Sequence, residues 1–111
     1  MMTFTESELL RVFVGEQEKL HHRPVYELLV SEALDHGMAG ATVFRGLLSF
    51  GLSHKLHTTK ILELAGDLPM VVEIIDSTEK IEEFLPLVEA MLRDADAKAM
   101  VTRESVKHWT T

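Results

Sequence analysis

GATVFRGLLSFGLSHKLHTTKILELAGDLPMVVEIID, residues 40–76, decides how the rest of the chain is arranged. Its first part, Ala41 to Phe50, carries apolar residues on both faces of a two-residue alternation, which predicts a long strand. Its last part, Pro69 to Ile75, is β-branched and almost entirely apolar, as a strand buried on both faces would be. Residues 51–60, GLSHKLHTTK, contain two lysines, two histidines and no acid. We therefore predict two scaffold strands joined by a flexible basic loop at about 51–60, and this loop is the expected working surface.

The composition is that of one ordinary globular domain spanning residues 1–111, with 46% hydrophobic and 26% charged residues. A formal net charge of −7 argues against a general nucleic-acid binder, which usually carries a basic excess. The chain has no cysteine, which excludes disulfides, zinc–thiolate sites and a thiol nucleophile. The acidic start has no signal-peptide core, and no apolar run reaches the roughly 20 residues that span a bilayer. We expect a cytoplasmic protein with no direct membrane insertion.

Two helices and a first strand surround this stretch. Residues 8–14 alternate as a strand, and residues 16–22 read as a polar connection. Pro24 suits the first turn of a helix that continues to His36, where Gly37 is a natural left-handed cap. Apolar spacings of three and four predict a second amphipathic helix, which runs from Ile81 to Leu92.

The ends of the second helix and the last part of the chain are less sharply patterned. Residues 76–79 resemble a capping box with Asp76 as the acceptor. Pro86 lies inside the helix and predicts a bend, because its ring removes one backbone hydrogen bond. Residues 60–65 fit a short strand or a loop. A short last strand is expected at 99–102, and residues 105–109 fit a further strand or a tail.

The resulting order is strand, helix, strand, strand, helix, strand. This order predicts an α+β fold, the ferredoxin-like βαββαβ sandwich, with both helices on one face of an antiparallel sheet. Leu9 and Phe13 point to the other face, so large apolar side chains remain there. A monomer rarely exposes such a patch, which favours self-association into a closed oligomer.

An extended likeness to a known family runs over residues 8–106. RVFVGE, HRPVYELLVSEALDHGMAGATVFRG and HTTKILELAGDLPMVVEIIDSTEKIEEFLP together resemble the small uncharacterised PII-like proteins of bacteria and archaea, which are similar in fold to nitrogen-regulatory PII and CutA proteins. The resemblance implies a homotrimer packed sheet to sheet, with a long loop after the second strand. It also implies that this loop contacts a partner, such as a transporter or enzyme, and that its base helps to hold a nucleotide between subunits.

Three segments allow this resemblance to be followed residue by residue. Ser49-Phe50-Gly51 matches the Gly-Phe-Gly at the loop base of PII proteins, with serine in place of the first glycine. Residues 93–98, RDADAK, replace the glycine-rich turn that grips phosphates in PII. The arginine pair that PII proteins have near the C-terminus is not recognisable in this sequence, and Arg103 is the cation nearest to its position.

The basic loop is the best ligand candidate, because lysines attract phosphate as point charges and a mobile cationic loop can close on an anion. The predicted ligand-binding residues are Arg45, Phe50, Gly51, His54, Lys55, His57 and Lys60. The alternative is a solvated loop whose charges merely keep it exposed. A second basic group precedes the first helix and consists of Lys19, His21, His22 and Arg23. Either this group shares an anion with the N-terminus of the helix, which attracts negative charge, or its residues are simple loop charges.

The histidines and Arg45 leave other assignments open. His54 and His57 are three residues apart, which suggests a divalent-metal-responsive, CutA-like protein as the alternative, although no metal site is assigned. His36 lies near the predicted end of the first helix, where its side chain is expected to interact favourably with the helix dipole as a cap. Arg45 is expected to pair with Glu73 across the sheet or to face a ligand between subunits.

The hypothesis is a PII-like regulatory protein. It would bind a small anionic ligand, which the resemblance suggests is a nucleotide, near the base of the 51–60 loop, and ligand binding would change the order of that loop and its hold on a partner. No nucleophile elbow, P-loop or metalloprotease spacing appears, so we expect a protein that is not an enzyme.

Overall fold

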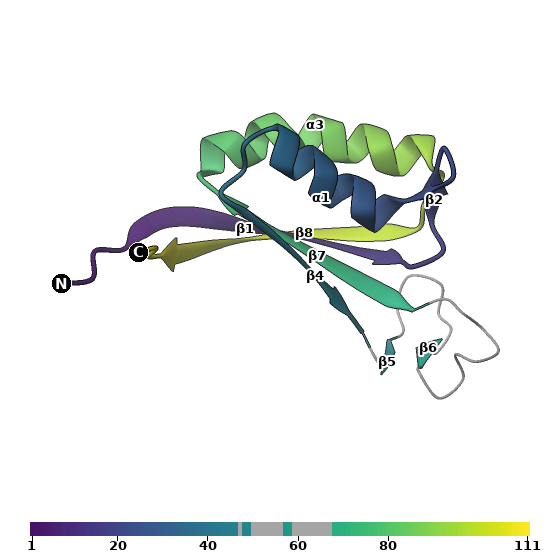
Figure 1. Ribbon diagram of the computed structural model, residues 1–111, viewed down its shortest axis with the longest axis horizontal. Helices are drawn as coiled ribbons and strands as arrows, with labels where there is room; N and C mark the ends of the chain where they lie inside the picture. Colours follow the sequence, from purple (N-terminus) through teal and green to yellow (C-terminus); the bar gives the residue numbers. More distant parts are fainter. Residues whose placement is uncertain (47, 50–56, 59–67) are drawn as a thin grey trace.

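The computed structural model describes residues 1–46, 48–49, 57–58 and 68–111 (Figure 1). The long strands are β1 (Thr5–Gly15), β4 (Gly40–Arg45), β7 (Pro69–Asp76) and β8 (Ala99–His108). The helices are α1 (Val25–Asp35) and α3 (Thr78–Asp94). Two-residue strands form two small pairs, β2 (Lys19–Leu20) with β3 (Arg23–Pro24), and β5 (Leu48–Ser49) with β6 (His57–Thr58).

The long strands form one antiparallel sheet in the order β4-β7-β1-β8. Figure 1 shows α1 and α3 side by side on one face of this sheet, and no helix of the described residues covers the other face, which we call the bare face. The predicted α+β, ferredoxin-like arrangement is therefore confirmed. It follows from two strand–helix–strand halves, each of which buries its helix on the same side.

The core lies between the helices and the two central strands. On β1 and β7 every second side chain is buried, and these side chains face one another in register, as in the pair Val12 and Val72. The helices add their apolar stripes. The buried residues of this core are Leu10, Val12, Val14, Val25, Leu29, Ala33, Met70, Val72, Ile74, Ile81, Phe84, Val88 and Met91. Full burial of one such large side chain contributes roughly 1.5–3 kcal/mol.

Two strands differ in length from the prediction. The strand expected from Ala41 to Phe50 leaves the sheet after Arg45. Gly46 then donates from its N–H to the carbonyl of Pro69 over 2.7 Å, so close that a Cβ on Gly46 would stand 2.7 Å from the Pro69 ring. The last strand is one uninterrupted β8 that pairs with β1 from Ala99 to His108. As an edge strand with most residues exposed, β8 needs no strict apolar alternation, which is why its sequence understates its length.

The connections and caps also differ in detail. The polar connection of residues 16–22 forms β2 and the turn of the β2–β3 hairpin, in which His21 and His22 have φ of 51° and 68°. A tight two-residue hairpin turn requires such positive values. Gly37 has the predicted left-handed φ of 67° at the end of α1.

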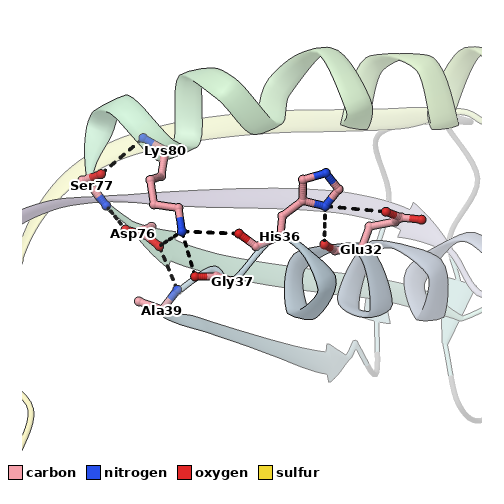
Figure 2. A network of polar contacts seen from close by, with 7 residues as sticks. All are labelled: Glu32, His36, Gly37, Ala39, Asp76, Ser77 and Lys80. Carbon is pink, nitrogen blue, oxygen red and sulfur yellow. Dashed lines mark hydrogen bonds and ion pairs between the residues drawn. The ribbon is translucent and has the colours of Figure 1, made fainter.

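The start of α3 has its cap one residue later than predicted. Ser77 is the N-cap, and its hydroxyl accepts from the N–H of Lys80 over 3.2 Å, while Asp76 binds elsewhere (Figure 2). The helix continues through Pro86, which is exposed and so lies away from the core.

Candidate functional site

The candidate ligand residues meet at one end of the sheet. Because the strands are antiparallel, β4 and β1 end where β7 and β8 begin, and α1 starts and α3 ends at this same end (Figure 1). We call it the loop end, since the excursion between Arg45 and Leu68 leaves and returns there. Segments far apart in sequence thus share one edge of the molecule: the end of β4, the β2–β3 hairpin and the turn before β8.

Arg45 is the last residue of β4 and forms an ion pair with Glu16, which follows β1. The Arg45 side chain is 54% exposed, so it stays accessible from solvent. Glu16 also donates its own N–H to the carbonyl of Leu68 over 2.7 Å, which ties the end of β1 to the return of the loop. The predicted pairing of Arg45 with Glu73 is wrong. Arg45 lies opposite buried Met70 and so faces the helix side, whereas Glu73 points to the bare face.

The second basic group lies on the β2–β3 hairpin, beside the start of α1. All four of its side chains are exposed: Lys19, His21, His22 and Arg23. Pro24 is the N-cap of α1 and makes no side-chain capping bond, while the N–H of Val25 donates to the Glu18 carbonyl over 2.9 Å. Cations and the positive end of a helix dipole therefore occur together, an arrangement that favours negative charge.

An open hollow of about 290 Å³ lies between the end of α3 and the start of β8. Its lining consists of Leu92, Arg93, Asp96, Ala97 and Ala99. The adjoining turn is held in place because the N–H of Lys98 donates to the Glu18 carboxylate over 2.8 Å, which links this turn to the hairpin region. The lining contains one arginine and one aspartate, so it carries no net formal charge. Its volume is near the lower end of the range for small-molecule pockets.

Most of the predicted loop residues fall outside the described part of the chain. Phe50, Gly51, His54, Lys55 and Lys60 lie there. His57 belongs to β6, whose backbone pairs with Ser49 of β5. Of the predicted ligand set, the structure therefore places Arg45, at the point where the chain leaves the sheet, and the backbone of His57.

Arg103 lies away from the loop end and is held within the fold. Its guanidinium binds both oxygens of the nearly buried Glu8 and donates to Glu82 of α3 over 2.7 Å. The hydrogen bond with Glu8, followed by that with Glu82, raises the pKa of Arg103 above its ordinary value. This cation joins β8 to β1 and α3, which is a structural role.

Sequence reasoning missed the acids that hold these segments together, two by ion pairs with arginine and one, Glu18, by a bond from a backbone N–H. Glu16, Glu18 and Glu8 have no distinguishing pattern in the sequence, and their partners are 29, 80 and 95 residues away. The alternation of residues 8–14 is the one useful signal, since it places Glu8 on the buried face of the first strand.

Within the ranges that the structure describes, no three histidine, aspartate or glutamate side chains cluster as metal ligands would. Within the same ranges, no helix has the length and apolar character needed to cross a bilayer.

Comparisons with known proteins give a consistent result. The model of the family DUF190, described as "Uncharacterized ACR", matches residues 7–108. A UPF0166 protein of Aquifex aeolicus is 40% identical over 84 residues, which covers 76% of this chain and 80% of the relative. A UPF0166 protein of Methanocaldococcus jannaschii is 24% identical over 89 residues, covering 80% and 82%.

Solved structures with a similar fold include CPII of Thiomonas intermedia, a nitrogen regulatory PII-like protein. Its complex with ADP, AMP and bicarbonate superposes with a TM-score of 0.64 at 16% identity, covering 97% of this chain and 92% of CPII. Its apo form gives a TM-score of 0.67 at 10% identity, covering 100% of both chains. At such identities the likeness concerns the fold, and this fold is PII-like.

Proposed function

The chain belongs to the DUF190 family, and from this membership and its fold we propose a PII-like regulatory protein that binds a small anionic ligand at the loop end. The observation that carries the proposal is the PII-like fold shared with CPII, a protein whose complex contains ADP, AMP and bicarbonate. The proposed ligand class is accordingly a nucleotide or a smaller anion of this kind.

The charge distribution supports this placement of the ligand. The chain has a formal net charge of −7, yet exposed Arg45 and the hairpin cations share the loop end, and the basic sequence 51–60, with Lys55 and Lys60, follows Arg45 along the chain. The uncapped start of α1 adds backbone N–H groups to the same region. An anion approaching this end meets cations on more than one element.

Regulation would follow from the position of the ligand at the root of the excursion between β4 and β7. A bound anion would neutralise lysines in residues 51–60 and favour one arrangement of that segment, which would then engage or release a partner such as a transporter or an enzyme. The proposed protein acts in the cytoplasm as a homotrimer, and its bare sheet faces meet at the centre of the trimer.

Calorimetric titration with ADP, AMP, ATP and bicarbonate, with and without magnesium, tests this function. The variant Lys55→Ala with Lys60→Ala should weaken binding of the best ligand at least about tenfold, because two phosphate-binding charges are lost. Its melting temperature should stay within a few degrees of the wild type if these lysines serve the ligand and not the fold.

Lys107→Ala is the matched control, because Lys107 is an exposed cation at the far end of β8. It should bind as the wild type does. Unchanged affinity in the double lysine variant would contradict the site. No binding of any of these anions, together with copper or zinc binding that His54→Ala with His57→Ala abolishes, would favour the CutA-like alternative.

A further inference from the structure

Glu16 contacts the chain both where the excursion between β4 and β7 leaves the sheet and where it returns. Its carboxylate forms an ion pair with Nη2 of Arg45, the last residue of β4. Its backbone N–H donates to the carbonyl of Leu68 over 2.7 Å. Leu68 is 2% exposed and directly precedes β7, so this second contact is fixed in the protein interior. The backbone of Glu16 is therefore held at the point where its side chain meets Arg45.

The two side chains of this ion pair differ in their exposure to water. The Glu16 side chain is 20% exposed, whereas that of Arg45 is 54% exposed. A guanidinium has five N–H donors, and the bond with Glu16 uses Nη2. This nitrogen belongs to both edges with which an arginine can bind a carboxylate or a phosphate through two parallel hydrogen bonds. An anion that binds Arg45 in this bidentate way must therefore displace the Glu16 carboxylate or lie directly beside it.

The backbone on either side of this ion pair is fixed by the start of β7. Gly46, which follows Arg45, donates its N–H to the carbonyl of Pro69 over 2.7 Å. Gly15, which precedes Glu16, is the β1 partner of the same Pro69. An anion at this point can thus redirect the Arg45 side chain while the strands keep their places. Only one partly exposed ion pair has to open, and such pairs contribute little to stability.

The cations of the β2–β3 hairpin are placed differently. The side chains of Lys19 and Arg23 are exposed, and within the described part of the chain neither of them forms an ion pair. An anion that approaches the hairpin has no carboxylate to displace there, whereas an anion that approaches Arg45 meets Glu16. The effect of Glu16 on an anion is therefore local to Arg45.

We propose that Glu16 is an internal competitor for the anion, a residue that weakens anion binding at Arg45 and so sets the concentration at which the site fills. Without an anion, the Glu16 carboxylate occupies the guanidinium. A phosphate group, which carries up to two negative charges, takes its place when it binds. Because the backbone of Glu16 stays bonded to Leu68, the carboxylate remains close to Arg45 and the competition is intramolecular. This inference rests on the proposed function, since it concerns the same anion and the same arginine.

Calorimetric titration of the wild type and of Glu16→Gln with ADP tests this competition. The substitution removes the charge, keeps the size of the side chain and leaves the backbone bond to Leu68 in place. Glu16→Gln should bind ADP about two- to fivefold more tightly, the affinity equivalent of an exposed ion pair. Glu18→Gln is the matched control, because the Glu18 carboxylate accepts from the backbone N–H of Lys98 over 2.8 Å. It removes the same charge two residues away and should change the affinity less than about 1.5-fold, since separated exposed charges are screened by salt.

A double-mutant cycle separates this competition from the general field of the protein. In the Arg45→Met background, Glu16→Gln should no longer tighten ADP binding, because the contested cation is absent. Glu16→Ala is the second variant, since it also removes the oxygen that the new amide could offer to Arg45, and it should gain at least as much affinity. An equal gain with and without Arg45 would overturn the inference. Weaker binding by Glu16→Gln and Glu16→Ala would also overturn it, because Glu16 would then position Arg45 for the anion.

The titrations distinguish this inference from the proposed function. ADP binding by the wild type, with unchanged affinity in Glu16→Gln, would contradict the competition alone. ADP binding by Glu16→Gln but not by the wild type would support the competition, because the carboxylate would then exclude ADP at the concentrations used. No ADP binding by either protein would overturn the competition together with the nucleotide part of the proposed function.

Discussion

The two ends of the sheet use their charged residues in different ways. At the end opposite the loop, where α1 stops and α3 begins, the polar side chains bind the backbone (Figure 2). Lys80 donates to the carbonyl of Gly37 over 2.8 Å and to that of His36 over 3.3 Å. Asp76 accepts from the N–H groups of Ala39 and Ser77 over 2.8 and 2.6 Å. One ion pair at 3.8 Å joins Lys80 to Asp76, so both helix ends share a single network.

The loop end has the opposite character. The start of α1 has no side-chain cap, and the hairpin cations are exposed. Arg45 is bound by Glu16 yet remains half exposed. The comparison teaches that the cation at the helix junction, Lys80, holds the backbone, while the cations at the loop end are accessible to a solute. Three substitutions test this difference.

Asp76→Ala should have the largest effect. The Asp76 side chain is 14% exposed and accepts two backbone N–H groups, so its removal leaves donors of two segments without their partner. We expect the free energy of unfolding in urea to fall by about 2–3 kcal/mol. Asp76→Asn retains one acceptor oxygen and should lose about half as much. A loss below about 0.5 kcal/mol for the alanine variant would remove the distinction between the two ends.

Gly37→Ala should have an intermediate effect of about 1 kcal/mol, because φ at this position is 67° and a side chain there strains the backbone. Space is not the cause, since the nearest atom to an added Cβ, Lys80 Nζ, would be 3.7 Å away. Gly37→Asn is the control, as asparagine tolerates the left-handed region and should cost less. Thermal and urea unfolding of both variants measure the difference, and equal losses for alanine and asparagine would contradict this explanation.

Arg45→Met should have the smallest effect on stability, less than about 0.5 kcal/mol, because exposed ion pairs contribute little. Its affinity for the best anion from the titrations should fall several-fold, since a cation at the root of the loop is lost. Arg45→Lys keeps the charge and should retain most of the affinity. An unfolding loss above about 1 kcal/mol in Arg45→Met would mean that the loop end is also held by its charges.

The sequence predicted the elements whose patterns are set by local burial. The first strand, both helices and the strand beginning at Pro69 lie against the core, and their apolar spacing follows directly from that contact. The edge strands were predicted less well. β4 is shorter and β8 longer than expected, because an edge strand is fixed by hydrogen bonds with its neighbour and leaves little trace in the side-chain pattern.

The cap of α3 shows the same limit on a smaller scale. Asp76 and Ser77 are both good capping residues, and the sequence alone favoured Asp76. The Asp76 carboxylate is instead directed to Ala39, 37 residues away, which leaves Ser77 to cap the helix. Long-range contacts therefore chose between two locally equivalent solutions.

The sequence by itself determined the fold class, the family likeness and the basic segment, because alternation, helical spacing and local charge are properties of neighbouring residues. Only the tertiary structure decided which charges meet. Arg45 binds Glu16 across 29 residues of sequence, and Arg11 binds Glu73 across 62. Such pairs depend on strand order and register, and a shift of one residue would turn each side chain to the opposite face of the sheet.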